Sequence, residues 1–312
     1  MRRAVLLYNP VSGARSNERL ATLELVAEAL RHNGLTVDIV PTTAPGSAGA
    51  QAKADSTADI IFACGGDGTV HEVLQGAAFH PRAALGLLPL GTGNVLARHL
   101  GLPLEPVAAA LAQLDYAPRT LPLGLLEYTA ANGPRQRYFL VMAGAGPDGE
   151  LVRTSMQTLK LTLGRAAYHV RAVRLFLHAS FPECTVRLTL PSGEIVERKA
   201  AGLMAIRGSD LGGILGPRAL RGALHRRHLQ VTILRPPVRL ALLAWLASGW
   251  VPVPGSALVE SFEAVSITAT AGLDADVQVE ADGEWLGHTP LALRVVPDAL
   301  RLLLPPTWPT EP

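Results

Sequence analysis

The sequence predicts two domains: an α/β N-terminal domain, with a parallel sheet wound with helices, and an antiparallel β-sandwich C-terminal domain. Up to about residue 121, short apolar runs alternate with helical patterns, an order typical of a parallel sheet. Beyond that residue, short β-branched runs follow one another and are joined by turn pairs, as in antiparallel sheets. The chain has 312 residues, 48% of them hydrophobic, which is enough for two cores.

The α/β domain begins with a strand over residues 4–8, which ends in a polar, glycine-containing turn at residues 9–13. A helix is expected over residues 18–32, because apolar residues recur there at helical spacing and Gly34 follows as a stop. Residues 35–40 form the next strand. An alanine-rich helix then leads to the central stretch of the domain.

The central stretch is an apolar run, residues 60–64, that ends in the turn Gly-Gly-Asp-Gly-Thr at residues 65–69. The run suits a strand buried on both faces, and the glycines leave main-chain amides open to a ligand. Thr69 is expected to be the N-cap of a helix to about residue 79, because Glu72 completes a Thr-x-x-Glu capping box. A turn that enters a helix N-terminus favours phosphate. The alternative is an ordinary tight turn.

Asp67 stands between these glycines, where a carboxylate disfavours an anion unless a cation bridges the two. Asp67 and Glu72 are therefore candidate ligands of a nucleotide-bound Mg²⁺. Residues 84–88 form a further strand and end in a second glycine turn at residues 91–94. Because ligands gather at the carboxyl ends of parallel strands, we expect these turns to converge on one ligand.

The second domain contains turn pairs such as Asn-Gly at residue 132 and Asp-Gly at residue 282. An apolar helix is expected over residues 155–177, and a further apolar stretch covers residues 238–251. The expected strands cover residues 123–128, 138–142, 185–190, 194–207, 229–234, 265–269, 277–281 and 291–296.

Composition excludes several classes of protein. Cys64 and Cys184 are too few for a disulfide framework and are expected to be inert thiols. The formal net charge of +2 gives no reason to expect nucleic-acid binding. No apolar stretch reaches the length of a membrane span, and the N-terminal run reads as a strand and not as a signal peptide. We therefore expect a cytoplasmic protein.

Five motifs, in this order, resemble the diacylglycerol kinase catalytic-domain family, and more closely its soluble bacterial lipid kinases. The motifs are residues 9–13, residues 65–69 with Glu72, residues 91–94 followed by Leu-Ala-Arg at 96–98, residues 144–149 and residues 282–284. The resemblance covers almost the whole chain. It implies an NAD kinase/diacylglycerol kinase-like fold, with an ATP-binding domain over residues 1–121, onto which residues 297–312 pack back, and a lipid-substrate domain over residues 122–296.

The resemblance also implies an activity. The chain would be an ATP-dependent, Mg²⁺-requiring phosphotransferase of phospholipid biosynthesis, acting on a diacylglycerol-like or sphingoid hydroxyl. Glu284, supported by Asp282, would be the base, with Asp67 as a further catalytic residue. The residues implied at the nucleotide are Asn9, Pro10, Val11, Ser12, Gly13, Thr43, Gly65, Gly66, Asp67, Gly68, Thr69, Glu72, Gly91, Thr92, Gly93 and Asn94. No Gly-Lys dipeptide occurs, which excludes a Walker A loop. On its own, Asp282-Gly283-Glu284 reads as a hairpin turn.

The chain departs from the family at three places. Val95 and Pro122 stand where members often carry Asp, and His-Arg-Arg-His at residues 225–228 replaces an Asp-Asp-Gly turn that holds a structural Mg²⁺ in some bacterial members. Because arginine does not ligate Mg²⁺, we predict that this structural metal site is absent. The missing acids leave a second reading open, a catalytically degenerate nucleotide- or lipid-binding sensor. An NAD kinase-like enzyme is the third, although no Asn-Glu pair follows the Gly-Gly-Asp-Gly-Thr turn.

A basic cluster adjoins the apolar stretch at residues 238–251. Its arginines, with two tryptophans of the stretch, are Arg218, Arg221, Arg226, Arg227, Arg235, Arg239, Trp245 and Trp250. Arginine and tryptophan together suit a segment that docks on anionic lipid, at the inner face of the membrane. The alternative is a solvated arginine turn followed by core.

Overall fold

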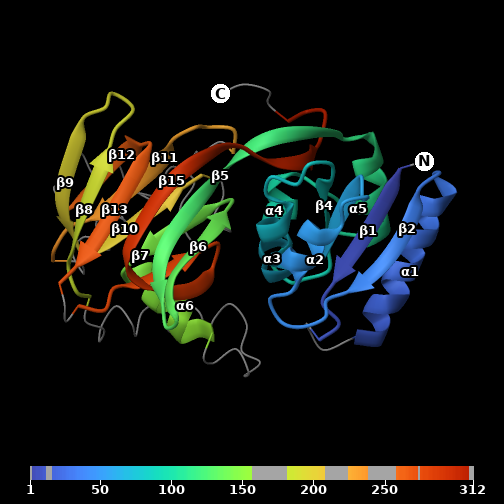
Figure 1. The fold of residues 1–312 in the computed structure, drawn as a ribbon, viewed down its shortest axis with the longest axis horizontal. Helices are drawn as coiled ribbons and strands as arrows, with labels where there is room; N and C mark the ends of the chain where they lie inside the picture. The colour runs from blue at the N-terminus through green and yellow to red at the C-terminus, as the bar shows by residue number, and fades with distance from the viewer. Residues whose placement is uncertain are drawn as a thin grey trace. The chain divides into compact units, whose positions relative to one another are not determined.

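The computed structural model describes residues 2–11, 16–156, 181–207, 224–237, 258–272 and 275–308. They form two compact units, Met1–Leu123 with Pro297–Pro312 and Gly124–Val296 (Figure 1). Two long strands, β5 (Ala117–Ala130) and β15 (Glu284–Leu304), carry the chain from one unit to the other.

The first unit is built on a parallel sheet. Its strands are β1 (Arg3–Tyr8), β2 (Thr36–Pro41), β3 (Ile60–Gly65) and β4 (Ala84–Pro89). Strand β1 pairs with β2 and β3, and β3 also pairs with β4, all in parallel. The end of β15 adds a further parallel strand, with Leu302 opposite Leu85. All side chains of β3 and β4 are buried, as expected for central strands covered on both faces.

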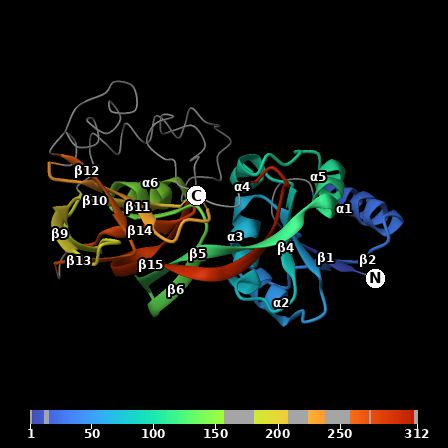
Figure 2. The ribbon, with the colours of Figure 1, turned by 90° about the horizontal axis from the view of Figure 1, so that it is seen from above.

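Helices cover both faces of this sheet. They are α1 (Ser16–His32), α2 (Ala48–Ala54), α3 (Asp67–Ala77), α4 (Val95–His99), α5 (Pro106–Ala112) and the short 3-10 helix η1 (Gln113–Asp115). Helix α1 packs with α5 and α2 packs with α3, and Figure 2 shows α1 and α5 above the sheet with α2 below it. Gly34 adopts φ +83° and donates its N–H to Arg31 O at 2.9 Å, which confirms it as the stop of α1.

The second unit is an antiparallel sandwich. In addition to the β5 and β15 portions, its elements are β6 (Gly133–Phe139), β7 (Met142–Ala145), α6 (Pro147–Met156), β8 (Cys184–Thr189), β9 (Ile195–Ala200), β10 (Gly202–Ile206), β11 (Leu229–Leu234), β12 (Val259–Ala264), β13 (Ser266–Ala271) and β14 (Gln278–Ala281). One row of strands runs β12-β11-β10-β7-β14-β15, and a second runs β9-β8-β13-β15. Side chains of both rows, such as Val186 and Val231, share one core.

The architecture confirms the predicted fold class, with differences in detail. The single strand expected over residues 194–207 is wrong: the chain bends at Ala201 and forms β9 and β10. Strand β12 was not predicted, because its sequence mixes charged and apolar residues and it lies at the edge of its row. Helices α4 and α5 were also not predicted.

Two predicted segments lie largely or wholly outside the described residues. Of the helix expected over residues 155–177, only the first two residues are described, within α6, which begins at Pro147. The stretch at residues 238–251 is outside the described part of the chain. Within the described part, no helix is long and apolar enough to cross a membrane. Cys64 and Cys184 are buried free thiols, and burial raises the pKa of Cys184 to about 11.

Candidate functional site

The carboxyl ends of the parallel strands lie at one level. Tyr8 at the end of β1 is opposite both Cys64 and Pro41, and Gly65 at the end of β3 is opposite Pro89. The turns that follow β1, β2, β3 and β4 therefore leave the sheet at the same edge. This is the edge at which the sequence analysis expected the glycine turns to meet.

Helix α3 begins directly in the Gly-Gly-Asp-Gly-Thr turn, earlier than predicted. Gly66 is the N-cap and Asp67 the first helical residue, and no side chain caps the helix. The predicted Thr69 capping box is therefore wrong. Thr69 N–H donates to Gly66 O at 3.0 Å, and its buried side chain folds back on the turn, where a Cβ on Gly65 would lie 2.3 Å from Thr69 Oγ1. Gly65 leaves room for the Thr69 side chain, and the helix starts three residues earlier than predicted.

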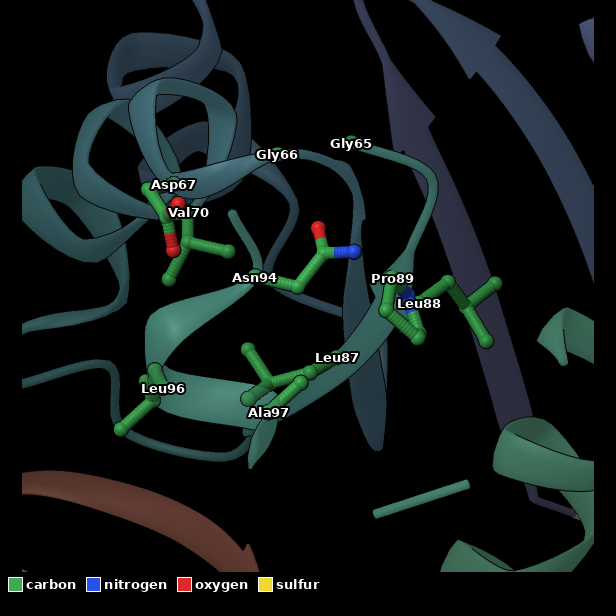
Figure 3. Close-up of a pocket in the computed structure, with 10 residues that line it drawn as sticks. All are labelled: Gly65, Gly66, Asp67, Val70, Leu87, Leu88, Pro89, Asn94, Leu96 and Ala97. Carbon is green, nitrogen blue, oxygen red and sulfur yellow. The ribbon is translucent and has the colours of Figure 1, made fainter. Parts of the chain in front are cut away.

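The second glycine turn lies against the first. A Cβ on Gly91 would lie only 2.4 Å from Gly66 Cα, so Gly91 leaves no room for a side chain, and a Cβ on Gly66 would be a tight 3.2 Å from Gly91 Cα. Asn94, which has a left-handed backbone, closes this turn: its Nδ2 donates to Gly91 O at 2.7 Å and its Oδ1 accepts Gly91 N–H at 3.0 Å. Figure 3 shows Gly66, Asp67 and Asn94 around one small pocket, together with Val70 and side chains of β4 and α4.

Asp67 joins the two turns. Its Oδ1 accepts the main-chain N–H of Val95 at 2.7 Å, and its Oδ2 would lie 2.5 Å from a Cβ on Gly93. The structure thus brings together the two predicted glycine turns and the carboxylate between them. Glu72 lies within α3, one turn beyond Thr69.

The turns after β1 and β2 are held by local hydrogen bonds. Asn9 Oδ1 accepts Val11 N–H at 2.9 Å, and Thr43 N–H donates to Ser47 Oγ at 3.1 Å. Ser12 and Gly13 lie outside the described residues. Two arginines given no role in the sequence analysis donate to carbonyls of the candidate turns: Arg19 to Asn9 O and Arg98 to Gly93 O, both at 2.9 Å.

In the second unit, Asp282 and Gly283 form the turn between β14 and β15. Both have positive φ, 49° and 79°, which is the geometry of a two-residue hairpin. The Asp282 carboxylate is fully engaged: it accepts the N–H groups of Leu140, Val141 and Met142 at 2.8, 2.8 and 2.9 Å. The hairpin reading is therefore confirmed as geometry, and Asp282 is an anchor of the turn.

Glu284 is the first residue of β15 after this turn and forms an ion pair with Arg137 of β6. The side chains of Arg137 and Glu284 are 18% and 35% exposed, so the pair is half-buried. Tyr128 lies beside the pair, and burial, the largest cause, raises the pKa of its hydroxyl. Arg137 was not predicted as a site residue, since none of the motifs includes it.

Two buried carboxyl groups support the same hairpin. Glu280 Oε2 accepts Gly283 N–H at 2.9 Å, and the buried Asp148 carboxyl lies beside the Glu280 side chain, both next to Gly144. Burial raises the pKa of both groups, so that the pair holds a proton that exposed carboxyls would release. A Cβ on Gly144 would lie 3.2 Å from Asp148 Oδ2, so the first glycine of the 144–149 motif makes room for this pair.

The turn that replaces the family's Asp-Asp-Gly element contacts a buried guanidinium. Arg207, 2% exposed, donates through Nη2 to Leu224 O at 2.6 Å and through Nη1 to Arg226 O at 3.3 Å. Burial lowers the pKa of Arg207 to about 10, and the nearby Asp282 charge partly offsets this. In the described part of the chain, no three His, Cys, Asp or Glu side chains gather as metal ligands. The absence of a structural metal remains a prediction.

Comparison with known proteins gives the family. A family model of the diacylglycerol kinase catalytic domain matches residues 3–126, and one described as the YegS C-terminal NAD kinase beta sandwich-like domain matches residues 141–304. The chain therefore belongs to the diacylglycerol kinase catalytic-domain family, with the sandwich of the YegS type. This class of protein was predicted from the order of its motifs.

Individual relatives and a solved structure are consistent with this family. A protein of Pseudomonas aeruginosa (strain UCBPP-PA14), described as "Probable lipid kinase YegS-like", is 35% identical over 249 residues, 78% of this chain and 76% of its own. A protein of Bacillus subtilis (strain 168), described as "Diacylglycerol kinase", is 34% identical over 56% of each chain. A solved structure from Bacillus anthracis str. Sterne is similar with a TM-score of 0.73 at 22% identity, over 98% of both chains, which shows the shared fold.

Proposed function

We propose that this protein is an ATP-dependent lipid kinase that transfers the γ-phosphoryl group of ATP to a lipid hydroxyl with the help of Mg²⁺. The observation that carries the proposal is the contact between the Gly66 and Gly91 turns at the start of α3, where a Cβ would lie 2.4 Å from main chain. Such side-chain-free turns at a helix N-terminus suit phosphate groups. The names of the relatives, lipid kinase and diacylglycerol kinase, support the acceptor class.

The residues present fit the implied nucleotide and metal. The main-chain amides of the two turns and the positive end of α3 would bind the phosphates. Asp67, which lies between the turns, would hold Mg²⁺, and Glu72, five residues further along α3, is the other candidate ligand. When bound, the metal would neutralise charge on the phosphate oxygens.

In the proposed reaction, the lipid oxygen forms a bond to the γ-phosphorus while the bond to the ADP oxygen breaks. The proton of the lipid hydroxyl passes to the Glu284 carboxylate. Asp282 holds the turn that presents Glu284, through its three main-chain hydrogen bonds. A diacylglycerol-like or a sphingoid lipid would supply the hydroxyl.

The nucleotide site is tested with Gly68→Ala. A Cβ at Gly68 meets nothing within 4 Å, so the variant should fold as well as the wild type. Within the proposed site, the same methyl group should obstruct phosphate and weaken ATP binding about 10-fold or more. Gly272→Ala is the matched control, because its Cβ also meets open space but lies in the second unit. Unchanged ATP affinity in Gly68→Ala would remove this turn from the site.

The reaction is tested with ATP radiolabelled at the γ-phosphate, screened against diacylglycerol, sphingosine, ceramide, monoacylglycerol and NAD⁺. A labelled lipid that is lost in Glu284→Gln would support the kinase. Labelled NADP⁺ would instead support an NAD kinase-like enzyme. ATP binding without any labelled product would support the degenerate sensor, in line with Val95 and Pro122.

We also propose peripheral contact with anionic membrane through the basic cluster. Arg226, Arg227 and Arg235 are described, and Arg235 lies 3.4 Å from Glu260, whereas the remaining arginines and both tryptophans of the cluster lie outside the described residues. Binding that is equal on anionic and neutral vesicles, or that survives a joint Arg226→Gln and Arg227→Gln change, would contradict this proposal.

A further inference from the structure

We propose that Arg137 is a positioning residue for the phosphoryl transfer, which holds the Glu284 carboxylate in the orientation needed to accept the proton of the lipid hydroxyl. The inference rests on the proposed function, because it concerns the same site. Arg137 has no other assigned role. Arg137 lies on β6 and forms an ion pair with Glu284.

The location of Arg137 follows from the β5–β6 hairpin. Leu126 is opposite Arg137 and Tyr128 is opposite Arg135 in this pairing. Opposed residues of an antiparallel pair, and residues two apart along a strand, point to the same face. Arg135, Arg137 and Tyr128 therefore share one face of the hairpin, and Glu284 meets that face through Arg137.

The backbone of Glu284 is fixed more firmly than its side chain. The preceding residues are held by the Asp282 carboxylate, which accepts three main-chain N–H groups, and by Gly283 N–H, which donates to Glu280 Oε2. The Glu284 side chain is 35% exposed, and its hydrogen bond to Arg137 restricts its orientation. The contact is a charge-assisted hydrogen bond from Arg137 Nη2 to Glu284 Oε2, and such bonds are stronger than neutral ones.

The half-buried setting strengthens the pair. Arg137 is 18% exposed and Tyr128 packs against the sandwich core, so part of the solvent that would screen the two charges is excluded. Burial raises the pKa of Tyr128, and the Arg137 charge offsets this only in part, so its hydroxyl stays protonated at neutral pH. The Glu284 carboxylate is therefore placed by a half-buried cation on β6, beside a neutral hydroxyl.

The experiment measures kcat, the KM for the lipid and the KM for ATP in Arg137→Gln, Arg137→Lys and Glu284→Gln, with Arg135→Gln as the matched control. Arg135 is on the same strand and face, but it donates to Asn132 Oδ1 at 3.2 Å, and among the described residues Glu284 pairs with Arg137 and not with Arg135. Because a misoriented base loses rate more than affinity, Arg137→Gln should lower kcat about 10- to 100-fold with the KM for ATP unchanged. Arg137→Lys should recover part of the loss, and Arg135→Gln should match the wild type.

The double variant Arg137→Gln/Glu284→Gln separates positioning from other roles. If Arg137 acts through Glu284, the double variant should be no slower than Glu284→Gln alone. A multiplicative loss, or an Arg137→Gln enzyme with wild-type kcat, would overturn the inference and leave the kinase standing. A wild-type protein that labels no lipid would overturn the proposed function itself, and the inference with it. Thermal unfolding of every variant shows whether a loss of rate is a loss of fold.

Discussion

Asp67 Oδ1 accepts the main-chain N–H of Val95 at 2.7 Å, so one carboxylate ties the first glycine turn to the start of α4. This bond uses one oxygen of the residue that the sequence marked as a metal ligand and catalytic group. Val95 takes part through its backbone only, at a place where members of the family often carry an acid. The structure thus gives Asp67 a role in joining the turns, in addition to the proposed role at Mg²⁺.

Asparagine and alanine at position 67 separate these two roles. Asp67→Ala removes the acceptor and a favourable charge in the first turn of α3, and should lower the free energy of unfolding by about 1–3 kcal/mol. Asp67→Asn keeps an acceptor oxygen and should lose less, but should still lose kinase activity if the carboxylate binds Mg²⁺. Urea unfolding and kinase assays measure the two effects. An active Asp67→Asn would mean that the residue only joins the turns.

The contact between the two glycine turns predicts the effect of Gly91→Ala. The new Cβ would lie 2.4 Å from Gly66 Cα and 3.0 Å from Asn94 Oδ1, so the turns must separate. We expect a loss of about 1–3 kcal/mol in the free energy of unfolding, together with weaker ATP binding. Gly68→Ala, whose Cβ meets open space, is the control for the free energy of unfolding, and Gly272→Ala is the control for ATP binding. A wild-type urea midpoint for Gly91→Ala would show that the turns are not held in contact.

The buried Asp148–Glu280 pair predicts a pH dependence of stability. Burial raises both pKa values above the ordinary 3.8 and 4.5, so the folded protein keeps a proton that the unfolded chain has lost. Because the folded state then binds more protons, the pair's contribution is present at low pH and is lost as pH rises through the raised folded pKa. Asp148→Asn, a neutral hydrogen-bonding replacement, should make stability less dependent on pH above about pH 5.

Urea unfolding between pH 5 and pH 9 measures this slope, with Glu150→Gln as a control on the same helix. Glu150 forms a 2.6 Å ion pair with Arg153. Its replacement should leave the change of the free energy of unfolding with pH as in the wild type. An Asp148→Asn protein whose stability changes with pH as steeply as the wild type would show that the pair does not share a proton.

The buried guanidinium of Arg207 predicts a large effect of its removal. Arg207→Met would leave the carbonyls of Leu224 and Arg226 without their donor and Asp282 without a nearby cation, for an expected loss of about 2–4 kcal/mol. Arg207→Lys should lose less. Arg82→Met is the control: its side chain is 57% exposed and its pair with Asp59 should contribute under about 1 kcal/mol. Equal urea midpoints for the Arg207 and Arg82 variants would contradict this account.

The turn at residues 225–228 predicts the response to metal removal. Arg207 already donates to the main-chain oxygens of Leu224 and Arg226, and the turn itself supplies no carboxylate. A chelator should therefore leave the melting temperature of the nucleotide-free protein unchanged. A fall on chelation that is reversed by Mg²⁺, or anomalous scattering from a divalent ion in this turn, would show that a structural metal is bound.

Much of the fold could be predicted because its signals are local. The alternation of apolar runs and helical patterns predicted the parallel sheet, and Gly34 was correctly placed as the stop of α1. Glycines at the strand ends indicated the turns of the first unit. Where packing competed with a local rule, the prediction was wrong: Thr69 has the sequence of a cap, but its side chain packs on Gly65, and the helix starts earlier.

The sequence by itself determined the fold class of the two domains, the order of the motifs and hence the family. The reason is that strand period, helix period and glycine turns each depend on residues that are close together in the chain. Only the tertiary structure decided which charged groups meet. Arg137 and Glu284 are 147 residues apart, and Asp282 reaches the amide of Leu140 across 142 residues. Such pairs depend on strand register and on how much water the surrounding side chains exclude, and a short stretch of sequence determines neither of these.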